Sequence, residues 1–187
     1  SAMTRCGRLC DVWAGIAAAE AAGFRDLKFD TVLIGGFNDD EIEALTDLSR
    51  THPWEMRFIE LMPMGPCAEW DTHRFLPAET VLARVTDLEP IAPQGVARRY
   101  RLPGAKGTVG LISPVSHDFC ADCRRIRVTA DGKLKSCLHS REELPLRGLH
   151  GEALEAAIRQ GIACKPAKHH LAERRSDTPR TMDQIGG

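Results

Sequence analysis

Three cysteines in one short segment have the spacing of a metal site. Cys120, Cys123 and Cys137 form the pattern Cys-x2-Cys-x13-Cys. Two cysteines separated by two residues can direct both sulfurs at one metal centre. The Asp131-Gly132 pair that follows is a strong hairpin signal, and a hairpin would return the chain so that Cys137 closes the site. The spacing therefore predicts a site held by three thiolates.

Three kinds of site agree with this spacing. A structural zinc site needs a fourth ligand, which His117 or His139 could supply as Cys3His. A cubane iron–sulfur cluster held by three cysteines leaves one iron without a protein ligand. A disulfide with a spare thiol is the third, but the seven cysteines of the chain are an odd number, and clustered cysteines in a reducing compartment more often bind metal. Spacing alone leaves zinc and iron–sulfur open.

Arginines follow the second cysteine directly. Arg125 and Arg127 would share one face of a strand, because strand side chains repeat every second residue. Two guanidinium groups on one face suit bidentate binding of phosphate, although a solvated charged edge is the common alternative. The pattern favours a phosphate-bearing ligand beside the metal centre.

Two further cations stand in segments that are otherwise apolar. Lys28 and Arg57 each lie in or beside a predicted buried strand. A buried charge must be paired or face a ligand cavity, since an unpaired one costs several kcal/mol. Asp30 could pair with Lys28 and Glu60 with Arg57, so a cationic cavity and structural pairing are both open.

The composition is that of an ordinary globular protein. The chain has 187 residues, 43% apolar and 27% charged, with a formal net charge of −1. This balance excludes a general polyanion-coating role, and we expect no nucleic-acid partner. No apolar stretch approaches the roughly 20 residues of a membrane span, and the first residues show no secretory signal. We expect a cytoplasmic protein without membrane contact.

Apolar periodicity predicts the elements that position these residues. The first part reads as helix, strand, helix, strand, the rhythm of a parallel α/β sheet, over residues 11–23, 27–34, 39–50 and 56–62, with Asp39 or Asp40 capping the second helix. The later elements are a helix, four short strands and a second helix, over residues 78–85, 98–102, 108–112, 126–129, 133–137 and 152–163.

A unit with two parallel strands needs partners for its faces and edges. We therefore expect the α/β class, with residues 1–63 as the last strands and helices of an incomplete (β/α) TIM-type barrel. Residues 64–187 would be a carboxy-terminal α+β cluster-binding region. The alternative is a small α+β domain in which the early strands pair with the later ones.

Several motifs in order resemble one enzyme family. The run ISPVSHDFCADC at 112–123, RIR at 125–127, ADGK at 130–133 and Cys137 resemble GTP 3′,8-cyclases, radical S-adenosylmethionine enzymes of molybdenum cofactor biosynthesis. RFIELMPMG at 57–65, KPAKHHL at 165–171 and MDQIGG at 182–187 are similar as well. The resemblance runs from about residue 11 to the last residue.

The resemblance implies a cluster and a nucleotide in one site. A [4Fe–4S] cluster would be held by Cys120, Cys123 and Cys137, and its open iron would meet the guanine of GTP. The family's GTP-binding cations map onto Lys28, Arg57, Arg125 and Arg127.

Four other positions carry expectations from the same resemblance. Met62 and Asp30 match positions near S-adenosylmethionine, although the family usually has asparagine where this chain has Asp30. The terminal Gly186 and Gly187 match the catalytic tail, where a side chain would prevent close backbone approach. Arg124 also departs from the asparagine that is common at its position.

The family's second cluster, which cleaves S-adenosylmethionine, has no matching motif. Cys6 and Cys10 have the first spacing of Cys-x3-Cys-x2-Cys, but Trp13 stands at the third position. The resemblance therefore implies the carboxy-terminal part of a GTP 3′,8-cyclase, which makes (8S)-3′,8-cyclo-7,8-dihydroguanosine 5′-triphosphate from GTP. S-adenosylmethionine and the second cluster would belong to the full-length enzyme only, and we expect this chain alone to be inactive.

The partners expected are GTP and, through exposed strand edges, further copies of the chain as a homo-oligomer. A different class of function stays open beside the enzyme: a zinc-stabilised binding module for protein or nucleic acid, favoured by the arginine run and the two nearby histidines. A standalone electron carrier is a third.

Overall fold

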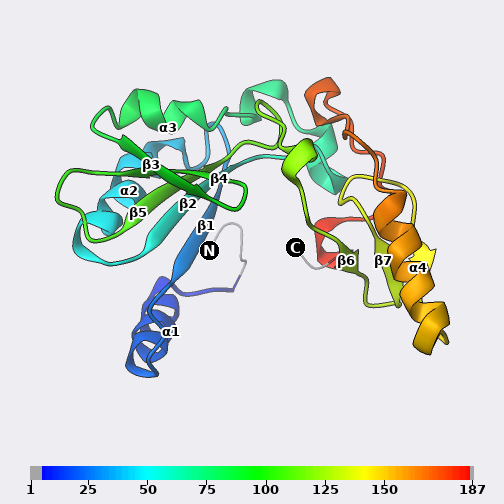
Figure 1. The fold of residues 1–187 in the computed structure, drawn as a ribbon. Coiled ribbons are helices and arrows are strands. Elements are labelled where there is room, and N and C mark those ends of the chain that lie inside the picture. The colour runs from blue at the N-terminus through cyan, green and yellow to red at the C-terminus, as the bar shows by residue number, and fades with distance from the viewer. Residues whose placement is uncertain (1–5, 186–187) are drawn as a thin grey trace.

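The computed structural model describes residues 6–185 and forms two parts (Figure 1). The larger part is a five-stranded sheet with helices against it, and the smaller part carries a three-stranded sheet and the last helix. The α-helices are α1 (Leu9–Ala21), α2 (Ile42–Thr51), α3 (Glu79–Arg84) and α4 (Gly151–Ala163). The strands are β1 (Lys28–Leu33), β2 (Glu55–Glu60), β3 (Glu89–Gln94), β4 (Ala97–Arg101), β5 (Thr108–Ile112), β6 (Arg127–Val128), β7 (Lys133–Lys135) and β8 (Leu144–Pro145).

Six short 3-10 helices complete the described elements. They are η1 (Asp39–Glu41), η2 (Gly65–Glu69), η3 (Thr72–Arg74), η4 (Cys120–Asp122), η5 (Leu171–Glu173) and η6 (Met182–Gln184). The helix predicted from residue 39 begins as η1 and continues as α2, and no side chain caps either start. The prediction that Asp39 or Asp40 caps this helix is therefore wrong.

The large sheet is mixed, with strand order β1-β2-β5-β4-β3. β1 pairs with β2 and β2 with β5 in parallel, whereas β5, β4 and β3 are antiparallel neighbours. The predicted α/β class and parallel first pair are confirmed. An early strand also pairs with a later one, as the alternative interpretation expected. Between residues 6 and 185, no strand pairs with the outer edge of β1.

Helices α2 and α3 cover one face of this sheet. The core combines alternate strand residues with helix residues, as the period of two in a strand requires; its buried members are Leu33, Ile42, Phe58, Ala78, Val81, Val109 and Leu111. The other face of β1 is exposed at Lys28, Asp30 and Val32. The prediction of a strand buried on both faces is wrong for β1, because it is an edge strand with one uncovered face.

Helix α1 packs only lightly on the sheet and has no buried residue. The Trp13 ring lies 6.2 Å from the Trp54 ring, and Glu20 Oε1 accepts a hydrogen bond of 2.9 Å from Trp54 Nε1. The helix ends before Gly23, whose φ of +95° is the left-handed conformation that commonly stops a helix.

The smaller part is built on the predicted hairpin. β6 and β7 pair antiparallel around Asp131-Gly132, and Gly132 has a φ of +78° as a tight turn demands. α4 packs against β7 so closely that a Cβ at Gly161 would collide with the Leu134 side chain. The predicted hairpin and the helix predicted over residues 152–163 are both confirmed.

A buried carboxylate joins the sheet to the segment that leads to the cysteines. Glu60, at the end of β2, is fully buried. It accepts hydrogen bonds from the backbone of Ala78 (3.0 Å), Val115 and Ser116 (2.9 Å each), and from the Ser116 hydroxyl. β2, the start of α3 and the loop before η4 are thus held by one side chain.

An ion cluster attaches the last segment to the hairpin. Arg180 bonds both oxygens of Glu143, at 2.5 and 2.7 Å, and Asp131 Oδ2 at 2.8 Å. Ile185, five residues further on, is buried.

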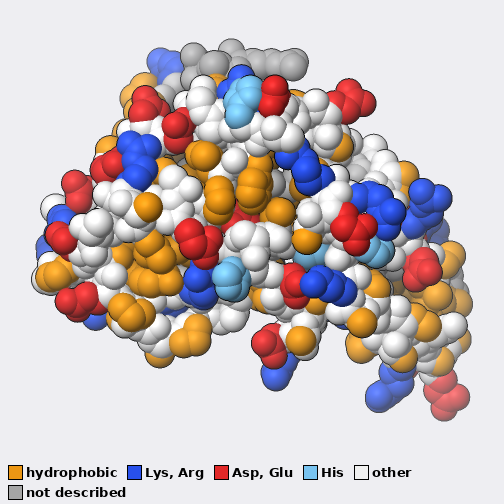
Figure 2. Space-filling view, turned by 90° about the horizontal axis from the view of Figure 1, so that it is seen from above, with side chains coloured by type: hydrophobic (Ala, Val, Ile, Leu, Met, Phe, Trp, Pro, Cys, Tyr) orange, Lys and Arg blue, Asp and Glu red, His pale blue; other side chains and the backbone are white. Residues whose placement is uncertain are grey.

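The surface is mixed in charge. On the face seen in Figure 2, basic and acidic side chains are interspersed around exposed apolar ones. No helix among residues 6–185 has the length and apolar character that crossing a bilayer requires.

Replacing Glu60 by alanine is expected to lower the free energy of unfolding by about 3–5 kcal/mol, because buried N–H groups lose their acceptor. Urea denaturation followed by circular dichroism measures this. Glu155→Ala is the matched control, since Glu155 is exposed and pairs only with Arg159 on α4. Equal unfolding midpoints for the two variants would contradict the role given to Glu60.

The Arg180 cluster predicts a pH dependence. The Arg180 guanidinium lowers the pKa of Asp131 and of Glu143 below their ordinary values. A carboxyl whose folded pKa is lowered stabilises the fold above its unfolded pKa and loses that contribution as pH falls toward the folded pKa. The urea midpoint of the wild type should therefore exceed that of Arg180→Met by a constant amount from pH 8 to 5.5, and the difference should shrink toward pH 3.5. A difference that grows on acidification would contradict this assignment.

Candidate functional site

One cavity brings most of the predicted site residues together. It has a volume of about 360 Å³ and extends from the uncovered face of β1 and β2 to the cysteine segment. Its lining includes eight expected residues: Asp30, Arg57, Met62, Cys120, Cys123, Arg125, Arg127 and Cys137. Lys28 instead lines a separate cavity with Arg99, Arg101 and Lys106. Gly186 and Gly187 lie outside the described residues.

The three cysteines are half-buried free thiols on the wall of this cavity. Burial raises the pKa of Cys120, whereas a hydrogen bond from the His169 backbone acts to lower it. Burial also acts to raise the pKa of Cys123, but hydrogen bonds from the Arg125 backbone and Lys165 outweigh it and the net pKa is lowered.

The described residues do not form a closed site for a single metal ion. Between residues 6 and 185, no three cysteine, histidine, aspartate or glutamate side chains are arranged to hold one ion. His117, one possible zinc ligand, is exposed and lies 3.9 Å from Glu79. His139, the other, lines the cavity, but its Nδ1 lies 3.0 Å from the Ser176 hydroxyl.

The donor set suits an iron–sulfur cluster better than one ion. A cubane takes each thiolate on a different iron, so its ligands stand farther apart than those around a single zinc. Three free thiols that line one cavity, with no three described side chains gathered around a single ion, are chemically consistent with such a cluster.

Arg57 is held by Asp30 across the two parallel strands. Arg57 Nε and Nη2 donate to the two carboxylate oxygens at 2.5 and 2.8 Å, a bidentate pair. The predicted pairings of Arg57 with Glu60 and of Lys28 with Asp30 are therefore wrong. Gly110 on β5 leaves room for this pair, because a Cβ there would lie 3.0 Å from Arg57 Cγ.

Arg125 and Arg127 both line the cavity beside the cysteines. Arg127 Nη1 donates to the Ile185 carbonyl at 3.2 Å, which ties the last described residue to the cavity wall. Arg125 is exposed, and within residues 6–185 its guanidinium has no hydrogen-bond or ion-pair partner. The neighbouring Arg124 is exposed and does not line the cavity.

Two lysines of this cavity have no assigned role in the sequence patterns. Lys165 donates to Cys123 and to the Arg125 backbone from a segment about forty residues away. Lys135 is fully buried and bonds the Ser140 carbonyl, with Glu143 at 3.8 Å. Burial lowers the pKa of Lys135. The strand pattern gave no signal for this burial, because Lys135 points to the face opposite Leu134 and shares its own face with Lys133.

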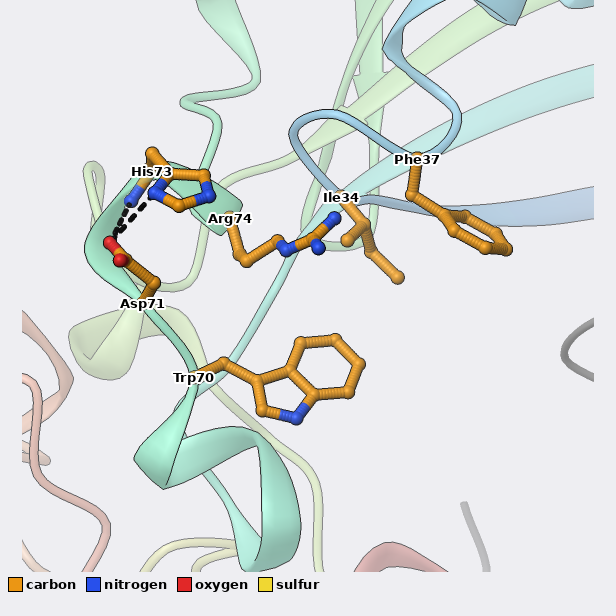
Figure 3. A pocket seen from close by; sticks show the side chains of 6 residues that line it. All are labelled: Ile34, Phe37, Trp70, Asp71, His73 and Arg74. Carbon is orange, nitrogen blue, oxygen red and sulfur yellow. Dashed lines mark hydrogen bonds and ion pairs between the residues drawn. The ribbon is translucent and has the colours of Figure 1, made fainter.

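A second cavity, of about 440 Å³, opens where β1 ends (Figure 3). Arg74 extends between the Trp70 ring and Ile34, and its Nη1 donates to the Gly35 carbonyl at 3.1 Å. His73 and Asp71 pair at 2.8 Å on its rim. None of the predicted site residues lines this cavity.

Comparisons with known proteins give one consistent result. The family model described as Molybdenum Cofactor Synthesis C matches residues 54–171. A GTP 3′,8-cyclase of Alkaliphilus metalliredigens is 45% identical over 191 residues, covering 99% of this chain. Those of Alkaliphilus oremlandii and Moorella thermoacetica are 41% and 42% identical, each covering 99% of this chain. The chain spans 60% of the length of each of these relatives.

The Asp30–Arg57 pair predicts a measurable change in anion binding. Asp30→Asn removes the carboxylate that occupies the Arg57 guanidinium, so affinity for inorganic tripolyphosphate should rise about threefold to tenfold at low salt. Isothermal titration calorimetry measures the change. Asp47→Asn, which removes the partner of Arg50 on α2, is the charge-matched control and should bind as the wild type does. Equal affinities for Asp30→Asn and Asp47→Asn would show that Arg57 does not contact the anion.

Proposed function

Because this chain belongs to the Molybdenum Cofactor Synthesis C family, we propose that it forms the carboxy-terminal part of a GTP 3′,8-cyclase. That enzyme would convert GTP to (8S)-3′,8-cyclo-7,8-dihydroguanosine 5′-triphosphate. The observation that carries the proposal is the single cavity that three free thiols and three arginines line together.

The cofactor proposed for this chain is a [4Fe–4S] cluster held by Cys120, Cys123 and Cys137. When bound, it would supply an iron without a protein ligand, to which the guanine of GTP could coordinate. The support is the chemistry of the donors: three half-buried free thiols on a cavity large enough for a ligand beside them.

The arginines would bind and orient the triphosphate. Arg125 and Arg127 lie beside the cysteines, and Arg57 lies across the cavity on β2, so negative charge along the cavity would be met from two sides. Lys28 lies on the same strand as Asp30 but lines the neighbouring cavity. It would bind GTP from the far end of the sheet face. The proposed role of Arg57 requires its guanidinium to leave Asp30 or to bind phosphate with the nitrogens that Asp30 does not use.

The remaining proposed roles concern the full-length enzyme. Residues 1–63 would supply the last part of a (β/α) barrel, supported by the parallel pairing of β1 with β2 and by the uncovered face of β1. Residues 64–187 would supply the cluster and GTP region, although the large sheet takes strands from both sides of residue 63. Met62 and Asp30 would face S-adenosylmethionine, and Gly186 and Gly187 would act as the catalytic tail.

Radical formation is proposed to lie outside this chain. A second cluster and S-adenosylmethionine would be bound by the part of the enzyme to which the other 40% of the relatives' length corresponds. Cys6 and Cys10 are exposed, and the Trp13 ring packs toward Trp54, so this segment offers no third thiolate. The chain alone should therefore form no cyclised product from GTP, S-adenosylmethionine and dithionite, and product detected by chromatography would contradict this division.

GTP binding to the anaerobically reconstituted chain tests the proposal. The wild type should be brown, contain about four irons per chain as a cubane requires, and bind GTP in calorimetry. Cys120→Ala should lose the cluster. Arg125→Ala should keep the iron and bind GTP at least tenfold more weakly, because a charge-assisted phosphate contact is lost.

Cys164→Ala is the control for cysteine removal, since Cys164 is exposed at the end of α4. It should match the wild type in iron content and affinity. A colourless chain with one zinc and no affinity for GTP would instead support a zinc-stabilised binding module, for which the presence of His139 beside the three cysteines in one cavity is the favouring observation.

A further inference from the structure

The ammonium group of Lys165 is fully engaged at the second cysteine. Lys165 Nζ lies 2.6 Å from the Cys123 carbonyl, 2.9 Å from the Arg125 carbonyl and 3.3 Å from Cys123 Sγ. An ammonium group has three N–H donors and no acceptor. Every donor of Lys165 therefore has an acceptor in the same three-residue segment.

The position of Lys165 is itself well defined. It lies two residues after the end of α4, and its backbone N–H donates to the Ile162 carbonyl at 3.2 Å. The side chain is partly buried and lines the cavity with the cysteines. Lys168 differs, because it is mostly exposed and pairs with Asp118 at 2.6 Å.

We propose that Lys165 is a positioning residue of the cluster site that also sets the reduction potential of the cluster. The inference rests on the proposed function, because it assumes a [4Fe–4S] cluster on Cys123. It goes further in assigning two roles to one side chain: fixing the segment of Cys123 and Arg125, and placing a positive charge beside one cluster-ligating sulfur.

The positioning role follows from the two backbone acceptors. The Cys123 and Arg125 carbonyls flank Arg124, and binding both from one ammonium group restricts the backbone over all three residues. The direction in which the Arg125 side chain extends from this backbone then depends on Lys165. Loss of Lys165 should for this reason weaken GTP binding even where the cluster is retained.

The electrostatic role follows from the contact with sulfur. Hydrogen bonds to the sulfurs of a cluster and nearby charge are established determinants of its potential. Reduction adds negative charge to the cluster, and a cation 3.3 Å from a ligating sulfur stabilises the reduced form more than the oxidised form. Removing the cation should move the midpoint potential to a more negative value.

The test compares three reconstituted variants with the wild type. Lys165→Met removes the charge and the donors but keeps an unbranched side chain that is only slightly shorter. Lys165→Arg keeps the charge, and Lys106→Met removes an equal charge in the other cavity. The measurements are iron and sulfide per chain, the midpoint potential from an anaerobic dithionite titration followed by electron paramagnetic resonance, and the rate of iron loss to a chelator.

We expect Lys165→Met to take up the cluster, to have a more negative midpoint potential than the wild type and to lose iron several-fold faster. Lys165→Arg should lie between them, and Lys106→Met should match the wild type. A purely structural role would accelerate iron loss without moving the potential. An unchanged potential in Lys165→Met therefore overturns the electrostatic assignment, and an unchanged rate of iron loss overturns the positioning role.

Two further outcomes have defined meanings. If Lys165→Met takes up no cluster, Lys165→Arg must retain it with a shifted potential, and loss of the cluster from both variants contradicts a role for charge. A wild-type chain that takes up no iron or sulfide contradicts the proposed cluster itself, whereas a normal cluster in every variant with identical potentials contradicts only the role of Lys165.

Discussion

The buried carboxylate of Glu60 sets the spatial relation between the sheet and the cysteine segment. It accepts hydrogen bonds from the start of α3 and from the loop at Val115 and Ser116, four residues before Cys120. Arg57 lies on the same strand, three residues earlier and on the opposite face. This one side chain therefore links the strand that carries Arg57 to the segment that leads to the thiols across the cavity.

The large sheet has one face covered by helices and one face that borders the cavity. The face under α2 and α3 holds the apolar core, whereas the opposite face presents Asp30 and Arg57 to the cavity. The absence of a side chain at Gly110 belongs to the same division, because it lets the long arginine side chain lie flat against the strands. A parallel sheet normally has both faces covered. The uncovered face is thus the one on which a nucleotide or a further part of the protein is expected to lie.

The local parts of this arrangement could be predicted from sequence, and the long-range parts could not. The Asp131-Gly132 hairpin and the first parallel pair follow from turn chemistry and strand composition, which act over a few residues. The pairing of β2 with β5 joins residues about fifty positions apart, and the residues of neither strand indicate which strand it will pair with. The Lys165 contacts with Cys123 have the same character. The prediction that the strand is buried is wrong at Lys28, because an apolar run does not show whether its strand will lie at the edge of a sheet or inside it. The roles assigned to the cysteines and arginines stay predictions, although the structure brings them to one cavity.

The bond between Arg127 and the Ile185 carbonyl has a practical consequence for handling the protein. Ile185 is buried, and its carbonyl is held at the wall of the cavity that contains the cysteines. Replacing Arg127 by alanine would remove a cation that lines the cavity and this backbone contact together, so Arg125→Ala is the simpler variant for ligand measurements.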